Sequence, residues 1–247
     1  MGRIECLIHN NNKLADLLLF GQLTFNIKKE IYFMYINLNE KESARKINCY
    51  RIELNSKPNL LAKTINTDRT LIIVIDMING FCKKGALASN RSADKIEPIV
   101  ELLNKLPNAK KVFVRDCHDI DAIEFKSYPP HCHDLQESAL IKELTCFNGI
   151  DVTKNSTNAF FALQNSILDL THYTNIVLVG VCTDICVMQL GLTLKAYFNE
   201  KNFSSNILVI MDCVDTFDSP LHDAELSNLF ALKFLEGAGV DIYKSIV

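Results

Sequence analysis

The distribution of apolar residues divides most of the chain into short and long segments. From Thr70 onward, short runs rich in Ile, Val and Leu alternate with longer stretches in which apolar residues recur every three or four positions. Short apolar runs bounded by polar residues are typical of buried strands, whereas the longer period is typical of amphipathic helices. The pattern predicts strands over residues 70–76, 111–116, 150–153, 175–181, 206–212 and 240–243, and helices over 93–106, 158–170, 184–198 and 222–239.

These elements predict an α/β fold. Strands and helices alternate along the chain, which is the pattern of a parallel sheet with helices on both faces. Several predicted strands, such as 70–76 (TLIIVID) and 175–181 (NIVLVGV), are apolar at both alternating positions, as strands buried on both sides must be. We therefore expect a three-layer sandwich around a mainly parallel, doubly wound sheet.

Residues 1–66 do not show this alternation of strand and helix patterns. They mix Asn and Lys with aromatic residues and contain no recognisable chemical motif. We interpret them as an N-terminal extension of unknown role, followed by one domain over residues 67–247. The most apolar run of the extension, residues 17–25, lies between charged residues and is too short to span a bilayer.

Composition and charge narrow the range of partners. A chain of 247 residues with 48% hydrophobic residues can bury the core of one large domain. Its net charge of −3 provides neither the basic surface of a nucleic-acid-binding protein nor a polybasic patch for a membrane. We therefore expect a small-molecule partner and no binding to nucleic acid or membrane. The nine cysteines are odd in number and scattered, which favours a reducing cytoplasm, and we expect a homo-oligomer.

Polar residues gather where three of the predicted strands end. Asp76 ends the first strand, Asp116 and His118 end the second, and Cys186 follows the strand over 175–181. In an open parallel sheet, ligands bind outside the carboxyl ends of the strands. The sequence therefore predicts one shared site for these side chains.

The two cysteines of the segment GVCTDICV differ in their expected positions. Cys186 falls in the first turn of a predicted helix, where unpaired backbone N–H groups and the helix dipole stabilise a thiolate. Cys182 precedes that helix, where its backbone N–H could matter more than its sulfur. We therefore expect Cys186 to be the nucleophile, although both cysteines could instead be buried small apolar residues.

Two further residues could assist a cysteine nucleophile. A carboxylate at the neighbouring strand end, Asp76, could accept the thiol proton. Lys154, in the segment DVTKNSTNAFF, could hold that carboxylate and balance the developing charge. Taken in isolation, Asp76 could equally cap a turn and Lys154 could be a solvated surface charge.

A second group of side chains has the composition of a metal site. Asp116 and His118 are two residues apart, so an extended chain projects both to the same side. His131 follows two prolines that stiffen its loop, and it could complete an Asp-His-His set with open positions for water and substrate. His133, two residues further on, is an alternative third ligand.

Five motifs, in this order, resemble the cysteine hydrolases of the isochorismatase-like superfamily and, within it, the nicotinamidase branch. The matching segments are Asp76-Met77-Ile78-Asn79-Gly80-Phe81, Asp116-Cys117-His118, Tyr128-Pro129-Pro130-His131-Cys132, Lys154 ahead of Ala159-Phe160, and the segment GVCTDICV from Gly180 to Val187. The resemblance covers residues 68–247. It implies the isochorismatase-like α/β sandwich and a cis peptide bond between Val181 and Cys182.

The resemblance also implies roles for the matched residues. The implied catalytic residues are Asp76, Lys154 and Cys186, with an oxyanion hole made by the backbone N–H groups of Cys182 and Cys186. The implied metal ligands are Asp116, His118 and His131, with Glu124 as a possible addition. Zinc is the expected metal, and iron and manganese are alternatives. Because the chain has no Trp, the aromatic contacts to the substrate fall to Phe81 and Tyr128.

The activity implied by the resemblance is a metal-dependent hydrolysis of nicotinamide to nicotinate and ammonia through a cysteine thioester. Cys117 stands where nicotinamidases often carry Trp, which leaves another small amide open as the substrate. True isochorismatases lack the nucleophilic cysteine, so Cys186 argues against that activity. From other classes, a thiol redox protein could use Cys182 and Cys186, and a non-catalytic binding module could retain the fold.

Overall fold

The computed structural model of the protein describes residues 39–166 and 168–247, so the apolar run over residues 17–25 lies outside the described part. By its contacts the chain divides into two compact units, Met1–Cys49 and Tyr50–Val247. In the first unit the description covers residues 39–49, and the second unit contains the whole sheet. The boundary expected between residues 66 and 67 stays a prediction.

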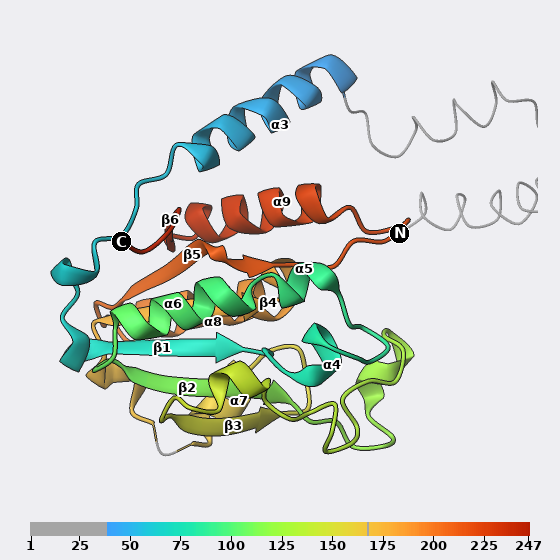
Figure 1. The fold of residues 1–247 in the computed structure, drawn as a ribbon. Helices are drawn as coiled ribbons and strands as arrows, with labels where there is room; N and C mark the ends of the chain where they lie inside the picture. The colour runs from blue at the N-terminus through green and yellow to red at the C-terminus, as the bar shows by residue number, and fades with distance from the viewer. Residues whose placement is uncertain (1–38, 167) are drawn as a thin grey trace, which may run out of the picture. The chain divides into compact units, whose positions relative to one another are not determined.

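The second unit is built on one sheet of six strands, all parallel (Figure 1). The strands are β1 Thr70–Ile75, β2 Lys110–Asp116, β3 Ile150–Lys154, β4 Asn175–Val181, β5 Asn206–Asp215 and β6 Asp241–Tyr243. Their order across the sheet is β3-β2-β1-β4-β5-β6. This is the doubly wound arrangement that the alternating pattern predicted.

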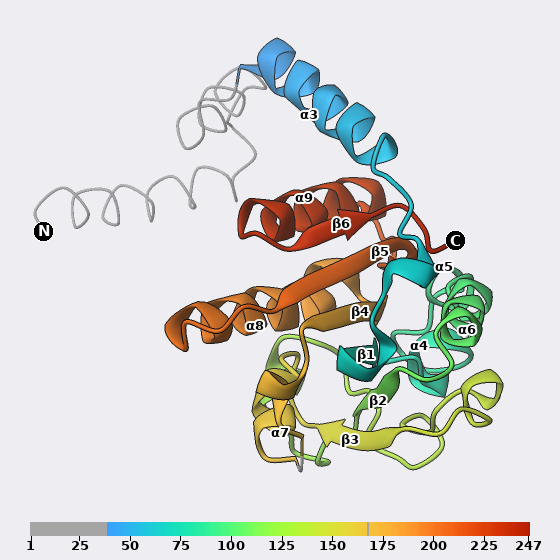
Figure 2. The same cartoon turned by 90° about the vertical axis from the view of Figure 1, so that its left-hand side faces the viewer.

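Helices cover both faces of the sheet and complete the expected three-layer sandwich (Figure 2). The α-helices of the second unit are α4 Asn79–Cys82, α5 Asn90–Ala93, α6 Ile96–Lys105, α7 Phe160–Gln164, α8 Met188–Glu200 and α9 Ala224–Gly237. Another described helix, α3 Glu40–Asn55, crosses the boundary between the two units. One core forms where Leu71, Ile73 and Ile75 of β1 pack with side chains of α7, α8 and α9. Ile72 and Val74 point the other way, into a second core with α6. The fully buried strands thus explain the absence of polar alternation in their sequences.

The central strands β1 and β4 leave no room for a side chain at one residue. Gly180 of β4 pairs with Ile75 of β1 and has a φ of 114°, a conformation that favours glycine. A Cβ atom at Gly180 would lie 2.0 Å from the carbonyl oxygen of Ile75. No larger residue fits there unless the two strand ends move apart.

Several helices differ from the prediction. Helix α3 was not predicted, because its sequence is rich in charged helix formers and has too few apolar residues for an apolar period. Helix α7 ends at Gln164 instead of continuing to residue 170, and the Ser166 hydroxyl donates to the carbonyl of Leu163 at that end. The helix predicted from residue 184 begins with a π-helical turn, Thr183–Val187, before α8.

No helix within residues 39–166 and 168–247 combines the length and the apolar composition that crossing a membrane requires.

Candidate active site

The predicted site residues meet where the strand order reverses. Strands β2 and β3 lie on one side of β1, whereas β4, β5 and β6 lie on the other. Asp76 directly follows β1, and Cys182 directly follows β4. The crevice outside two such strands is the usual ligand site of a doubly wound sheet. The fold therefore brings these two strand ends together, as the sequence predicted.

Asp76 is fully buried and is fixed by hydrogen bonds to β2. It has a φ of 54°, which Asp tolerates better than most residues. Its backbone N–H donates to the carbonyl of Val114 at 2.9 Å, and its Oδ1 accepts from the N–H of Asp116 at 2.9 Å. The carboxylate is thus anchored by one oxygen, while the other oxygen faces Lys154.

Lys154 contacts the other two predicted catalytic residues, Asp76 and Cys186. It ends β3 and is almost completely buried. Its Nζ lies 2.9 Å from Oδ2 of Asp76 and 3.7 Å from Sγ of Cys186, and it also pairs with Oδ1 of Asp116. The predicted base, lysine and thiol therefore lie in one buried cluster, so the alternative of Lys154 as a solvated surface charge is wrong.

Burial and neighbouring charges together determine the protonation states of Asp76 and Lys154. Desolvation, reinforced by the charge of Asp116, raises the pKa of Asp76 to about 6. Burial alone would lower the pKa of Lys154, but the charges of Asp116 and Asp76 outweigh it and raise that pKa well above its usual value. Lys154 therefore stays charged between the two carboxylates.

The thiol of Cys186 also responds to burial. Its side chain follows β4 on the π-helical turn, and desolvation raises the pKa of Cys186 well above its usual value, although the charge of Lys154 opposes this. The sequence predicted that the helix terminus would favour the thiolate. In the structure, burial favours the thiol instead, so a nucleophilic role for Cys186 would require a base such as Asp76.

The predicted metal ligands form a second buried cluster beside the first. Asp116, His118 and His131 each offer a ligand atom, and these atoms lie within 4.8 Å of one another. The two Nε2 atoms are 3.2 Å apart, and each lies 3.7 Å from Oδ2 of Asp116. One carboxylate and two imidazoles are a common donor set for a divalent transition metal, so the group fits such an ion.

Contacts behind the two imidazoles fix their orientation. His118 Nδ1 lies 2.9 Å from Oδ1 of Asn155, and His131 Nδ1 lies 2.8 Å from the carbonyl of Pro129. Because both acceptors bind the Nδ1 side, Nε2 of each ring remains available for a metal. Asn155 was not predicted, since nothing in its local sequence indicates which histidine it meets.

Glu124 and His133 differ in their relation to the metal group. Oε1 of Glu124 lies 3.8 Å from Nε2 of His118, and Oε2 accepts from the N–H of Thr157 at 3.0 Å. Glu124 is therefore held at the edge of the cluster. His133, by contrast, is exposed and does not belong to the Asp-His-His group.

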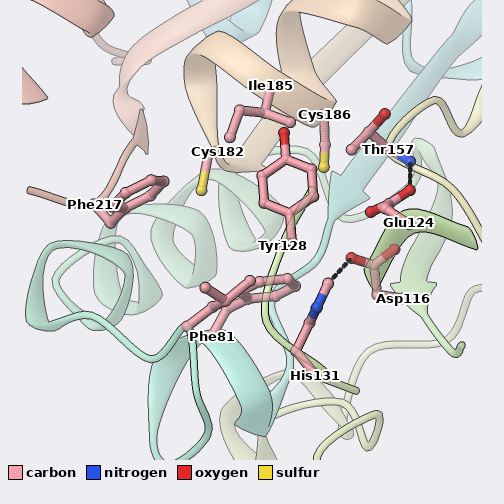
Figure 3. A pocket seen from close by; sticks show the side chains of 11 residues that line it. Phe81, Asp116, Glu124, Tyr128, His131, Thr157, Cys182, Ile185, Cys186 and Phe217 are labelled. Carbon is pink, nitrogen blue, oxygen red and sulfur yellow. Dashed lines mark hydrogen bonds and ion pairs between the residues drawn. The ribbon is translucent and has the colours of Figure 1, made fainter. Parts of the chain in front are cut away.

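A pocket of about 400 Å³, counting its open part, connects the two clusters. Its lining residues are Phe81, Leu87, Asp116, Glu124, Tyr128, His131, Thr157, Cys182, Ile185, Cys186 and Phe217. Figure 3 shows both sulfur atoms and the predicted aromatic residues Phe81 and Tyr128 facing this space. Apolar walls with a few convergent polar groups are typical of a small-molecule site.

The peptide bond between Val181 and Cys182 is cis, as the resemblance implied. Cys182 precedes the π-helical turn, and its thiol is buried at the pocket wall. The eight cysteines within the described residues are all free thiols. The sequence did not indicate Phe217, which reaches the pocket from the loop after β5, because no motif marks that loop.

Comparisons with known proteins place this architecture in a family. Residues 70–238 match the sequence model of the Isochorismatase domain. The chain is 28% identical over 219 residues to "Nicotinamidase 1" of Arabidopsis thaliana, which covers 74% of this chain and 88% of that protein.

Two solved structures share the fold. The pyrazinamidase of Pyrococcus horikoshii, solved in complex with zinc, has a TM-score of 0.58 and 21% identity, covering 71% of this chain and 99% of that one. The N-carbamoylsarcosine amidase of Thermoplasma acidophilum has a TM-score of 0.57 and 22% identity, covering 71% and 96%. Together with the match over residues 70–238, these findings confirm the resemblance: the chain belongs to the isochorismatase domain family, as a hydrolase similar to nicotinamidases and amidases.

Proposed function

We propose that this hydrolase converts nicotinamide to nicotinate and ammonia through a thioester on Cys186. One observation carries the proposal: Asp116 and His131, two members of the Asp-His-His group, line the same pocket as the thiol of Cys186. Such a site can hold the ring of a small aromatic amide at one end and its carboxamide at the other. The similarity to a plant nicotinamidase supports the same substrate.

The metal ligands would be Asp116, His118 and His131, with the Glu124 carboxylate beside His118 at the edge of this group. A bound divalent ion would supply an open coordination position for the ring nitrogen of nicotinamide. We expect zinc, because the donor set suits it and a structural neighbour was solved with zinc; iron and manganese suit the same donors.

The chain's own residues would carry the covalent steps. Asp76 accepts the proton of Cys186 while Lys154 holds the carboxylate, and the sulfur attacks the carboxamide carbon. The N–H groups of Cys182 and Cys186 stabilise the resulting oxyanion. Asp76 then gives its proton to the departing ammonia, which leaves a thioester. Asp76 next takes a proton from water, whose oxygen attacks the thioester carbon. The carbon–sulfur bond breaks, Asp76 returns the proton to the sulfur of Cys186, and the product leaves and ionises to nicotinate.

Two aromatic residues would orient the substrate ring. Phe81 and Tyr128 line the pocket between the thiol and the metal ligands (Figure 3). Their rings lie 5.7 Å and 6.3 Å from that of His131, so a planar substrate bound there would contact them.

An ammonia-release assay with a pair of substrates tests the proposal. Nicotinamide should be hydrolysed by the metal-loaded protein, whereas benzamide, which has the same shape without the ring nitrogen, should be hydrolysed at least about 10⁴-fold less efficiently. Nicotinaldehyde should inhibit by accepting the Cys186 thiolate. Equal hydrolysis of both amides would favour another small-amide hydrolase of the family.

The thiol redox alternative makes a different prediction. It requires a reversible disulfide between Cys182 and Cys186, and it assigns no role to the buried contacts of Lys154 with Asp76 and Asp116. Those contacts favour the amidase proposal. A measurable disulfide potential combined with no amide hydrolysis would reverse that preference.

A further inference from the structure

The pocket wall beside Cys182 depends on a histidine that the proposed mechanism does not use. Phe217 forms this wall, on the far side of the pocket from Asp116 and His131 (Figure 3). The imidazole of His222 stacks on the Phe217 ring, with 4.1 Å between centroids and 15° between planes. Both residues belong to the connection between β5 and α9. The position of the wall therefore depends on how His222 is held.

Both ring nitrogens of His222 face an oxygen that can only accept a hydrogen bond. Nε2 lies 2.7 Å from Oδ2 of Asp184, and Nδ1 lies 2.9 Å from the carbonyl oxygen of Phe217. A neutral imidazole has one N–H and can donate to one of them, whereas an imidazolium donates to both. The geometry therefore matches a charged His222 opposite an ionised Asp184.

The charges around His222 support the same state. Two carboxylates act on the ring: Asp184 from the π-helical turn and Asp218 from the loop of His222 itself. Burial alone would lower the pKa of His222, but the hydrogen bonds to Asp184 and to the Phe217 carbonyl outweigh it and raise that pKa. Oδ1 of Asp184 is buried and has no hydrogen-bond partner among residues 39–166 and 168–247, so the contact at Oδ2 matters all the more for this carboxylate.

The loop that carries His222 is itself well braced. The backbones of Ser219 and His222 exchange two hydrogen bonds, of 2.9 and 3.0 Å, and Oδ1 of Asp218 accepts from the N–H of Ala224. The His222 side chain then links this braced loop to Asp184, which lies two residues before Cys186. One imidazole thus connects the pocket wall with the segment that bears the nucleophile.

We infer that His222 is a positioning residue which, as an imidazolium, ties the Phe217 wall to the segment carrying Cys186. The inference rests on the proposed function in so far as an amide binds between this wall and the thiol. When the pH rises above the His222 titration, one of the two hydrogen bonds is lost and Phe217 is held less firmly. Because Phe217 contacts no reacting atom in the proposed mechanism, KM should rise more than kcat falls.

The charge state of the His222 imidazole can be measured without any substrate. Nitrogen-15 NMR of the full chain should show His222 titrating above about 6.5, the ordinary histidine value, with both nitrogens protonated below that pH. The signal is assigned by its loss in His222→Gln. In Asp184→Asn the midpoint should fall. A midpoint at or below about 6.5, or one that Asp184→Asn leaves unmoved, would overturn the inference.

The positioning role is tested by kinetics on the best amide substrate. His222→Gln, which can replace one hydrogen bond but cannot titrate, should raise KM about tenfold at pH 6.5, roughly the effect of one lost hydrogen bond. Its kcat should stay within about threefold, and the rise of wild-type KM at high pH should disappear. The exposed His172, changed to Ala, serves as the control and should leave both constants unchanged.

Two kinetic results would contradict the role: a fall in kcat at unchanged KM, or a KM in His222→Gln that keeps the wild-type pH dependence. Thermal unfolding of each variant shows whether it is folded. If the wild-type protein hydrolyses no amide, the proposed function fails, while the NMR titration still decides the state of His222.

Discussion

The two sides of the pocket are built in different ways. On one side, Asp116 and His118 come from the end of a single strand, and His131 joins them from a nearby loop. On the other side, Phe217 is held by a contact between His222 and Asp184, which are 38 residues apart. The first side is encoded by short spacings along the chain, and the second by a contact between two loops. The Asp-His-His group is therefore local in sequence, whereas the pocket wall opposite it is not.

The largest effect, on kcat, is expected at Cys186, the proposed nucleophile, which lines the pocket together with residues of both sides. Cys186→Ala should lower kcat for ammonia release by at least about 10⁴-fold, because removing one member of a cooperating set loses most of the rate. Cys182→Ala is the matched control and should retain most activity, since only its backbone N–H is used. A similar loss in both variants would indicate a redox pair.

The next largest effect concerns the metal side. Elemental analysis of the purified protein should find about one divalent ion per chain, as expected for three ligands with an open position. His118→Ala should lose this ion, because a carboxylate and one imidazole are a poor site. The exposed His133, changed to Ala, should keep it. Full metal content in His118→Ala would exclude His118 as a ligand.

A smaller effect, on metal affinity, is expected for Asn155, which contacts Nδ1 of His118. Asn155→Ala should weaken metal binding about 10- to 100-fold, because His118 loses the acceptor that fixes its ring. Asn155→Asp keeps an acceptor at this position and should restore most of the affinity. Chelator competition measures both. Unchanged affinity in Asn155→Ala would show that the Asp-His-His group is oriented without it.

The smallest effect concerns stability on the Phe217 side and its dependence on pH. Because the folded-state pKa of His222 is raised, its ion pair with Asp184 stabilises the fold fully below the unfolded value of about 6.5. That stabilisation is lost as the pH rises through the folded-state pKa. The melting temperature of the wild type should exceed that of His222→Gln by about 2–4 °C at pH 5.5, the shift expected for about 1 kcal/mol.

At pH 9 this difference in melting temperature should largely disappear. His172→Ala again provides the control, since His172 is exposed and lies on another segment, the turn Leu170–His172 before β4. A difference that is the same at both pH values would mean that His222 stabilises the protein by packing alone.

The layers of the fold and the positions of the site residues could be predicted because each strand and the polar residue that follows it are neighbours in the sequence. The run TLIIVI predicts a strand that is buried on both faces, and Asp76 directly after it predicts a carboxylate at the carboxyl end of the sheet. Asp116 and His118 are brought together by strand geometry alone. Because the strands are parallel, their carboxyl ends and the residues that follow them lie at the same edge of the sheet.

Other features depend on contacts that the sequence does not reveal. Asn155 looks like any polar loop residue until the fold brings it to His118, and His222 looked like the start of a helix. The raised pKa of Cys186 was missed for the same reason, because the degree of burial follows from packing and not from the helix terminus. Helix α3 was missed because helix propensity without an apolar period is a weak signal.

The close approach at Gly180 has a consequence for how this enzyme can vary. Gly180 pairs with Ile75, and the next residues are Asp76, directly after β1, and Val181, which ends β4 before Cys182. The fit between the segments that carry the proposed base and the proposed nucleophile therefore depends on the absence of a side chain at position 180. Mutational tolerance at position 180 should be close to zero even though its glycine takes no part in the chemistry. A residue can thus be indispensable to an active site through the volume that it leaves empty.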